Sequence, residues 1–142
     1  MEFRSQICTN GIQSQRLIKL GLKKETADMK LFGYIYFSMK YKDYIISDET
    51  IAVDVEAPFN DNQYKEVCLS WSLHRLIEMI GNSDIEDCEV LPYGLGLKYK
   101  DVDCMMREQY FSYKKTLYDA IINGIEWLIK KGYFNKEYLN EI

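Results

Sequence analysis

Three stretches with a helical spacing of apolar residues, each followed at once by a glycine, divide this sequence of 142 residues. A glycine in that place is typical of a helix C-terminus, because it adopts the left-handed conformation without a steric penalty. The predicted helices are 12–20 before Gly21, a second from Ser70 or Ser72 to Ile80 before Gly81, and 113–131 before Gly132. Strands are therefore confined to the segments between these helices.

The first and third helices carry more detail. Thr9 or Asn10 is the expected N-cap of the first, and Leu22 is expected to contact Leu17 beyond the closing glycine. In the third, Gly124 interrupts a broad apolar stripe, where a glycine costs about 1 kcal/mol relative to alanine. We therefore expect Gly124 to mark a tight packing contact.

Between the helices the apolar residues alternate with a period of two, which is typical of strands. In 31–41 one face carries Leu31, Gly33, Ile35, Phe37, Met39 and Tyr41, and the other carries Phe32, Tyr34, Tyr36, Ser38 and Lys40. Further strands are expected at 44–47, at 51–56 and within 88–100, and a loop at 58–66. The order of elements predicts an α+β fold: a single domain, 1–142, with a mainly antiparallel sheet packed by about three helices on one face.

Composition excludes several classes of protein. More than a quarter of the residues are Leu, Ile, Val or Phe, which excludes disorder. No apolar run reaches the roughly 18 residues of a membrane span, and the first residues lack the pattern of a signal peptide. We therefore expect a cytoplasmic protein that makes no membrane contact.

Cysteine spacing argues against a metal site. The four cysteines are too far apart for a CxxC pair, and adding the single histidine, His74, matches no zinc-binding spacing. We expect reduced thiols and neither a metal nor a cofactor. The residues concerned are Cys8, Cys68, Cys88 and Cys104.

Charge is strongly segregated along the chain. Residues 1–42 carry 8 basic and 3 acidic side chains, whereas residues 43–92 carry 2 basic and 12 acidic ones. The interpretation we favour is that basic and acidic strands pair within one fold; the alternative is an acidic middle segment that faces a basic partner. The sequence pI of about 5.1 argues against duplex DNA as the main ligand.

Motifs that carry chemistry are few. Gly94-Leu95-Gly96 lacks the third glycine of a phosphate loop and is better explained as a strand with tight packing, and Asp101-Val102-Asp103 does not continue as a calcium loop. His74 and Glu78 stand four residues apart on one helical face, as an oriented base would require. Because both lie outside the apolar stripe of that helix, a solvated pair is the favoured interpretation.

Tyrosine is abundant, with 12 copies, and position must decide which of them matter. Tyr118 and Tyr133 are expected to contact the core, as is Tyr41 on the inner face of the first strand. Tyr34 and Tyr36 share the predicted outer face with Lys40. Such a face packs against a helix, binds a protein, or stacks a planar ligand or the bases of a single strand.

Three stretches resemble a family of small uncharacterised proteins of gut Bacteroidetes, their phages and mobile elements. They are Gln13-Ser14, Leu17-Ile18 and Gly21-Leu22 with Thr26-Ala27-Asp28-Met29; Trp71-Ser72-Leu73 with Leu76-Ile77; and Trp127-Leu128. Members of that family tend to leave the second helix through a proline, whereas this chain has Gly81-Asn82. The resemblance implies a bacterial or phage setting and no assigned activity. From the residues themselves, we expect Thr26 to cap a short helical turn and Asp28 to have a structural role.

The leading hypothesis is a non-enzymatic protein that acts through a protein partner, as an accessory of a mobile element or phage. The alternative is a binder of a nucleotide-like ligand or single-stranded nucleic acid through Tyr34, Tyr36 and Lys40. An enzyme that uses His74 and Glu78 is the third hypothesis. The sequence leaves the oligomeric state open.

Overall fold

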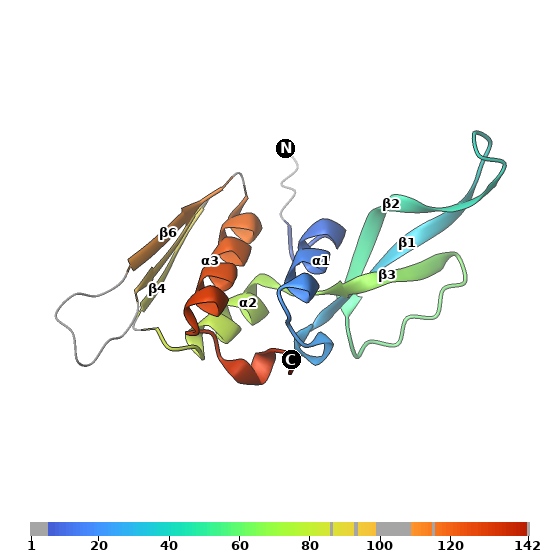
Figure 1. Cartoon of the computed structure of the whole chain (residues 1–142). Helices are drawn as coiled ribbons and strands as arrows, with labels where there is room; N and C mark the ends of the chain where they lie inside the picture. The colour runs from blue at the N-terminus through green and yellow to red at the C-terminus, as the bar shows by residue number, and fades with distance from the viewer. Residues whose placement is uncertain (1–5, 86, 93, 99–108, 115, 142) are drawn as a thin grey trace.

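The computed structural model describes residues 6–85, 87–92, 94–98, 109–114 and 116–141. Figure 1 shows two sheets at opposite ends of the molecule with the helices between them. The elements, in chain order, are α1 (Gly11–Lys19), η1 (Lys24–Thr26), β1 (Met29–Ser38), β2 (Asp43–Asp54), β3 (Tyr64–Ser70), α2 (Leu73–Gly81), β4 (Asp87–Leu91), β5 (Gly94–Lys98), β6 (Gln109–Tyr113), α3 (Leu117–Lys131) and η2 (Lys136–Tyr138).

The α+β class and the antiparallel pairing are confirmed, but the strands form two three-stranded sheets where the sequence suggested one. Their orders are β2-β1-β3 and β4-β5-β6. Alternation in a sequence indicates that a strand exists, but it does not identify the partner strand. Here each group of three strands pairs only within itself, and α2 separates the two groups in the chain.

The helix boundaries follow the predicted caps at most ends. Asn10 caps α1 in a reciprocal arrangement with Gln13, and the Leu22 amide donates to the Leu17 carbonyl at 3.2 Å beyond Gly21, which has a φ of +101°. Gly132 ends α3 with a φ of +77°. Gly21 and Gly132 therefore both adopt the left-handed conformation that was predicted for them at the ends of these helices.

Two predicted helix ends were wrong. Gly81 is the last residue of α2 and not its left-handed cap, and Asn82 follows with a φ of −90°. The third helix begins at Leu117 and not near Tyr113, because Tyr113 belongs to β6 and the Thr116 side chain caps α3 at the Asp119 amide.

The strand predictions near the first sheet also needed correction. β1 ends at Ser38, so residues 39–42 form a hairpin turn in which Lys42 has a φ of +51°. Tyr41, predicted to contact the core, is 63% exposed in this turn. The short strands predicted at 44–47 and 51–56 merge into the single strand β2, which ends at Asp54, and β3 begins at Tyr64 within the predicted loop.

The hydrophobic core lies between the helices and the second sheet. α3 packs its apolar stripe on β5, and a side chain at Gly124 would collide with Leu95, which confirms the predicted tight contact. Fully buried members of the core are Leu17, Leu22, Trp71, Leu76, Met79, Ile80, Leu95, Leu97, Ala120, Ile121, Ile122, Ile125 and Leu128. No residue of β1 or β2 belongs to this core. In the described part of the chain, no helix is long and apolar enough to span a membrane.

Tyr118 is predicted to make the fold sensitive to alkaline pH. Its side chain is buried, as expected from the sequence, and burial raises the pKa of its phenol to about 12. In the unfolded chain this pKa is about 10, so its contribution to stability is complete below pH 10 and is lost as the pH rises toward 12. We expect a loss of about 1 kcal/mol by pH 11.

The measurement compares urea unfolding at pH 8 and pH 11 for the native chain and Tyr118→Phe, which lacks the phenol. The variant should lose less stability between the two pH values, by about 1 kcal/mol. An equal loss in both proteins would show that other groups cause the alkaline sensitivity.

Candidate functional site

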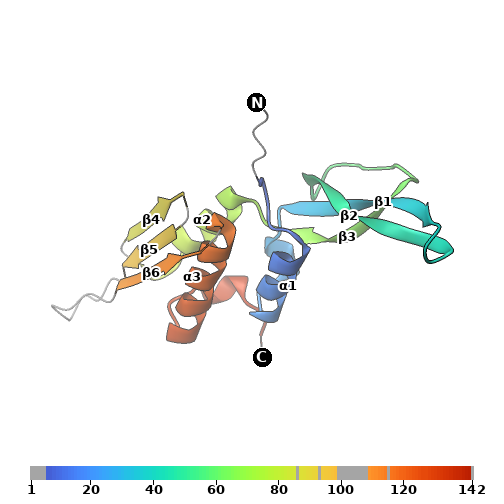
Figure 2. The ribbon, with the colours of Figure 1, turned by 90° about the horizontal axis from the view of Figure 1, so that it is seen from above.

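The sheet of β1, β2 and β3 projects beyond the helices, and we call it the sheet arm. In Figure 1 it extends to the right of α1, and the view from above in Figure 2 shows the same arrangement. α1 contacts β3, whereas the second sheet carries α3 along one face. The sheet arm therefore presents much of its surface without a covering helix.

Large apolar side chains gather at the far end of the sheet arm. We define the arm tip as Tyr36, Phe37, Met39, Tyr41 and Tyr44. Met39 is 82% exposed and Tyr44 is 70% exposed, and the other three are also exposed. Soluble chains expose single apolar residues routinely, but five large ones at the end of one hairpin are a feature of interaction sites.

The register of the hairpin explains why the arm tip is apolar on both of its faces. Phe37 lies opposite Tyr44, and their rings meet edge to face at 5.3 Å. Tyr36, the preceding residue, points to the other face, because successive side chains of a strand alternate. No single covering element would bury both faces.

Closer to the helices, one face of the sheet arm is closed by its own rings. Phe59, from the loop between β2 and β3, packs on Phe32 with a centroid distance of 4.4 Å. Tyr64 contacts both Phe59 and Tyr34, at 5.7 and 5.5 Å. This cluster gives Tyr34 a packing role, although its side chain remains 42% exposed.

The predicted site of Tyr34, Tyr36 and Lys40 is only partly assembled. Both tyrosines lie on the outer part of the same face of β1, as expected. Lys40 is in the hairpin turn and not on the strand, and its Nζ lies 5.2 Å from the centroid of Tyr41. Among the described residues, no hydrogen bond or cation–π contact joins Lys40 to either predicted tyrosine.

Sequence reasoning missed Phe37, Met39, Tyr41 and Tyr44 as candidate site residues. The pattern of alternation assigned the first three to the buried face of a longer strand. The signal that identifies them is the polar run Lys40-Tyr41-Lys42-Asp43, which interrupts two apolar stretches as a hairpin turn does. A turn at that point leaves the neighbouring aromatic residues at the free end of the sheet.

The strands of the basic start and the acidic middle segment do pair within one sheet, since β1 is hydrogen-bonded to both β2 and β3, but the pairing does not bring their opposite charges into contact. Arg16 binds Glu126 of α3 at 2.6 Å, and Glu78 pairs with His74 and Arg75 of its own helix. Within the described ranges, no ion pair joins residues 6–42 to residues 43–92. The four acidic residues of β2, Asp43, Asp48, Glu49 and Asp54, are all exposed.

His74 and Glu78 form the solvated pair that was expected. Their Nε2 and Oε2 atoms are 3.5 Å apart, and the His74 side chain is 89% exposed. Glu78 also accepts a hydrogen bond from Arg75 at 3.1 Å. Both side chains face solvent, which is the solvated arrangement favoured from the sequence.

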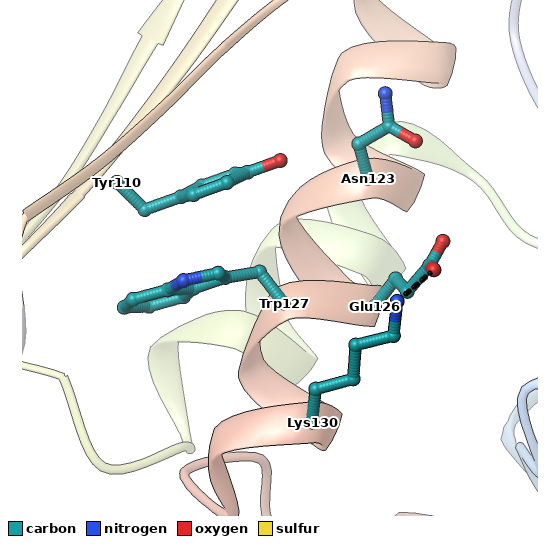
Figure 3. Close-up of a pocket in the computed structure, with 5 residues that line it drawn as sticks. All are labelled: Tyr110, Asn123, Glu126, Trp127 and Lys130. Carbon is teal, nitrogen blue, oxygen red and sulfur yellow. Dashed lines mark ion pairs between the residues drawn. The ribbon is translucent and has the colours of Figure 1, made fainter.

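Figure 3 shows a second candidate, a cavity of about 260 Å³ between β6 and α3. The Tyr110 and Trp127 rings stack at 4.9 Å on one side, so no planar ligand fits between them. Glu126 is bound by Lys130 and Arg16, and these hydrogen bonds hold the pKa of its carboxyl below the ordinary value. The charged groups of the cavity, Glu126 and Lys130, are thus already paired with each other.

The remaining motifs have structural roles. Gly94 and Gly96 lie in β5 under the Tyr113 and Phe111 rings, with the Tyr113 ring 2.7 Å from where a Gly94 Cβ would stand. This confirms close packing rather than phosphate binding. Asp101-Val102-Asp103 lies outside the described residues.

Cys8, Cys68 and Cys88 are free thiols whose pKa values are raised by burial. Cys104 lies outside the described residues. Across the part of the chain that the structure describes, no three His, Cys, Asp or Glu side chains gather as a metal site requires.

Asp28 has the structural role expected of it. Its carboxylate accepts hydrogen bonds from the Ser72 amide at 2.8 Å and the Ser72 hydroxyl at 2.5 Å, which fixes the N-terminus of α2. Thr26 does not cap the start of the short turn. It ends η1 and accepts a hydrogen bond from the Trp71 indole at 2.9 Å.

No family model, curated protein or solved structure matches this chain. The choice of function therefore depends on the chemistry of the sheet arm.

Proposed function

We propose that this chain is a protein-binding module without enzymatic activity, and that it binds its partner through the arm tip. The observation that supports this most directly is the exposure of five large apolar side chains on both faces of one hairpin. Tyrosine, phenylalanine and methionine are enriched at protein interfaces, where rigid rings contribute area at a low entropic cost. A partner that encloses the tip would bury both faces together.

The charge of β2 defines the partner further. Its acidic residues have no cation bound to them within the described residues, so a partner with Lys or Arg beside an apolar pocket is complementary. A second copy of the chain would bring like charges together along this strand. The same acidic residues disfavour the phosphates of a nucleic acid, which is why we prefer a protein to a single strand.

The test places a photo-reactive amino acid at position 41 in the arm tip and, as a control, at position 113 on the second sheet. Both native tyrosines are similarly exposed, at 63% and 64%. We expect a cross-linked protein from position 41 and none from position 113. Mass spectrometry identifies that protein, which is then purified for binding measurements.

With the purified partner, Met39→Ser/Tyr41→Ser/Tyr44→Ser should weaken binding by at least about 100-fold, because central aromatic residues carry most of an interface's energy. Stability should fall by about 1 kcal/mol or less, since the three side chains are mostly exposed. The matched control, Ile12→Ser/Tyr113→Ser, should bind normally. Equal binding by the tip variant and the native chain would contradict the proposal.

A further inference from the structure

The edge of the sheet arm opposite β2 borders a groove against α1. Two cavities of about 450 and 240 Å³ lie there, and they share Ile18, Lys24, Cys68 and Leu69 in their walls. Because they share these residues, they are two parts of one groove. Its remaining lining residues are Ser14, Gln15 and Lys19 of α1 with Glu66 and Val67 of β3.

The groove follows the open edge of β3. In the described part of the chain β3 pairs only with β1, so half of its backbone groups have no partner strand. Cys68 and Leu69 line both cavities and lie beyond the register shift of β3, where consecutive side chains point to opposite faces, so the groove lies at the strand edge. An extended segment placed there meets unpaired N–H and C=O groups.

The chemistry of the groove selects for an acidic segment. Ile18, Val67 and Leu69 offer apolar contacts. Lys19 and Lys24 are exposed, and neither belongs to an ion pair in the described residues. Among the residues that line the groove, Glu66 is the one carboxylate beside these two lysines.

We propose that the α1–β3 groove binds an extended, acidic segment of a partner protein as a fourth strand of the sheet arm. Main-chain hydrogen bonds to β3 supply affinity and the lysines select the sequence, as in strand addition generally. A second copy of the chain is a poorer occupant. Two β3 edges would oppose their lysines. Both edge strands carry a register shift, but that of β2 is the larger, because Gly33 and Ile35 pair with Thr50 and Ile46, whereas β3 has one extra residue between its pairs with Leu31 and Phe32. The arm tip is not part of the groove, so this inference goes beyond the proposed function.

The probe is a fluorescent hexapeptide that alternates valine and glutamate, titrated against the full chain. We expect saturable binding that Lys19→Glu/Lys24→Glu weakens by about tenfold, because two attractive pairs become repulsive. The matched control, Lys114→Glu/Lys136→Glu, makes the same change in net charge on exposed lysines outside the groove and should bind normally. A peptide that alternates valine and lysine should bind at least about tenfold more weakly.

Two further measurements locate the peptide. Bound peptide should slow the alkylation of Cys68, which lines the groove, and should leave Cys88 on β4 unaffected. N-methylation of every residue should abolish binding if the peptide adds as a strand, because it removes the N–H groups that face β3 in either register. Absence of binding at millimolar peptide, equal binding of the methylated peptide, or an unchanged affinity in the groove variant would each overturn the proposal. The proposal would also be overturned if the chain associates with itself and the groove variant abolishes this association, because the groove would then bind a second copy.

Discussion

Trp71→Ala is expected to lower the free energy of unfolding by about 3 to 5 kcal/mol, which is a large part of the stability of a domain of this size. The Trp71 side chain is fully buried, and its indole N–H donates to the Thr26 hydroxyl at 2.9 Å. Truncation would leave a cavity at the point where the end of β3 meets α2 and η1. Urea unfolding followed by circular dichroism measures the loss.

Trp71→Phe separates the cavity from the hydrogen bond. The phenyl ring fills most of the site but offers no donor to Thr26, so we expect a loss of about 1 to 2 kcal/mol. If Trp71→Ala lowers the free energy of unfolding no more than Trp71→Phe does, the indole does not stabilise the junction of β3, α2 and η1. Because Trp71 lies at the base of the sheet arm, the alanine variant should also weaken binding at the arm tip.

Local sequence signals were sufficient to predict the helix ends that are marked by a capping side chain or a left-handed glycine. Asn10 with Gln13, and the glycines at 21 and 132, specify helix ends through contacts within a few residues. The division into two sheets depends on contacts between distant residues. The alternation of 31–41 looks the same whether β1 is covered by a helix or stands in solvent, and this is why Tyr41 was assigned to the core.

The candidate site was predicted only in outline for the same reason. Tyr34 and Tyr36 follow from the period of two, and the structure places both on one exposed face. Lys40 was extrapolated along a strand that ends at Ser38. Because β1 ends two residues before Lys40, the candidate binding surface lies at the end of a hairpin and not in the middle of a sheet face.

The charge pattern also acquires a different meaning in three dimensions. The exposed carboxylates of β2 form one edge of the sheet arm, and Lys19 and Lys24 border the other. Segregation along the sequence therefore becomes segregation between two edges of one sheet. This arrangement is complementary to partners of opposite charge at the two sites that we propose.

Thr9→Val is expected to cost about 2 to 4 kcal/mol, although the two side chains have nearly the same shape. The Thr9 hydroxyl is fully buried and lies 2.7 Å from the Ser14 hydroxyl and 2.9 Å from the Ser70 hydroxyl. It also accepts a hydrogen bond from the Trp71 amide at 3.1 Å. Valine fills the same volume but leaves these buried polar groups without the Thr9 hydroxyl as a partner. A buried polar group that loses its partner pays its full desolvation penalty, which exceeds the net contribution of an ordinary hydrogen bond.

Thr9→Ser is the matched control, because it keeps the hydroxyl and loses one methyl group, at a cost of about 1 kcal/mol. Urea unfolding compares the two variants, and hydrogen exchange of the Trp71 amide reports the bond directly. Protection of that amide should fall in Thr9→Val and persist in Thr9→Ser. Since Thr9 and Ser14 belong to the segment that positions α1, while Ser70 and Trp71 belong to the end of β3, the hydroxyl holds the α1–β3 groove at its base. A valine variant as stable as the serine variant would mean that packing alone joins the sheet arm to α1.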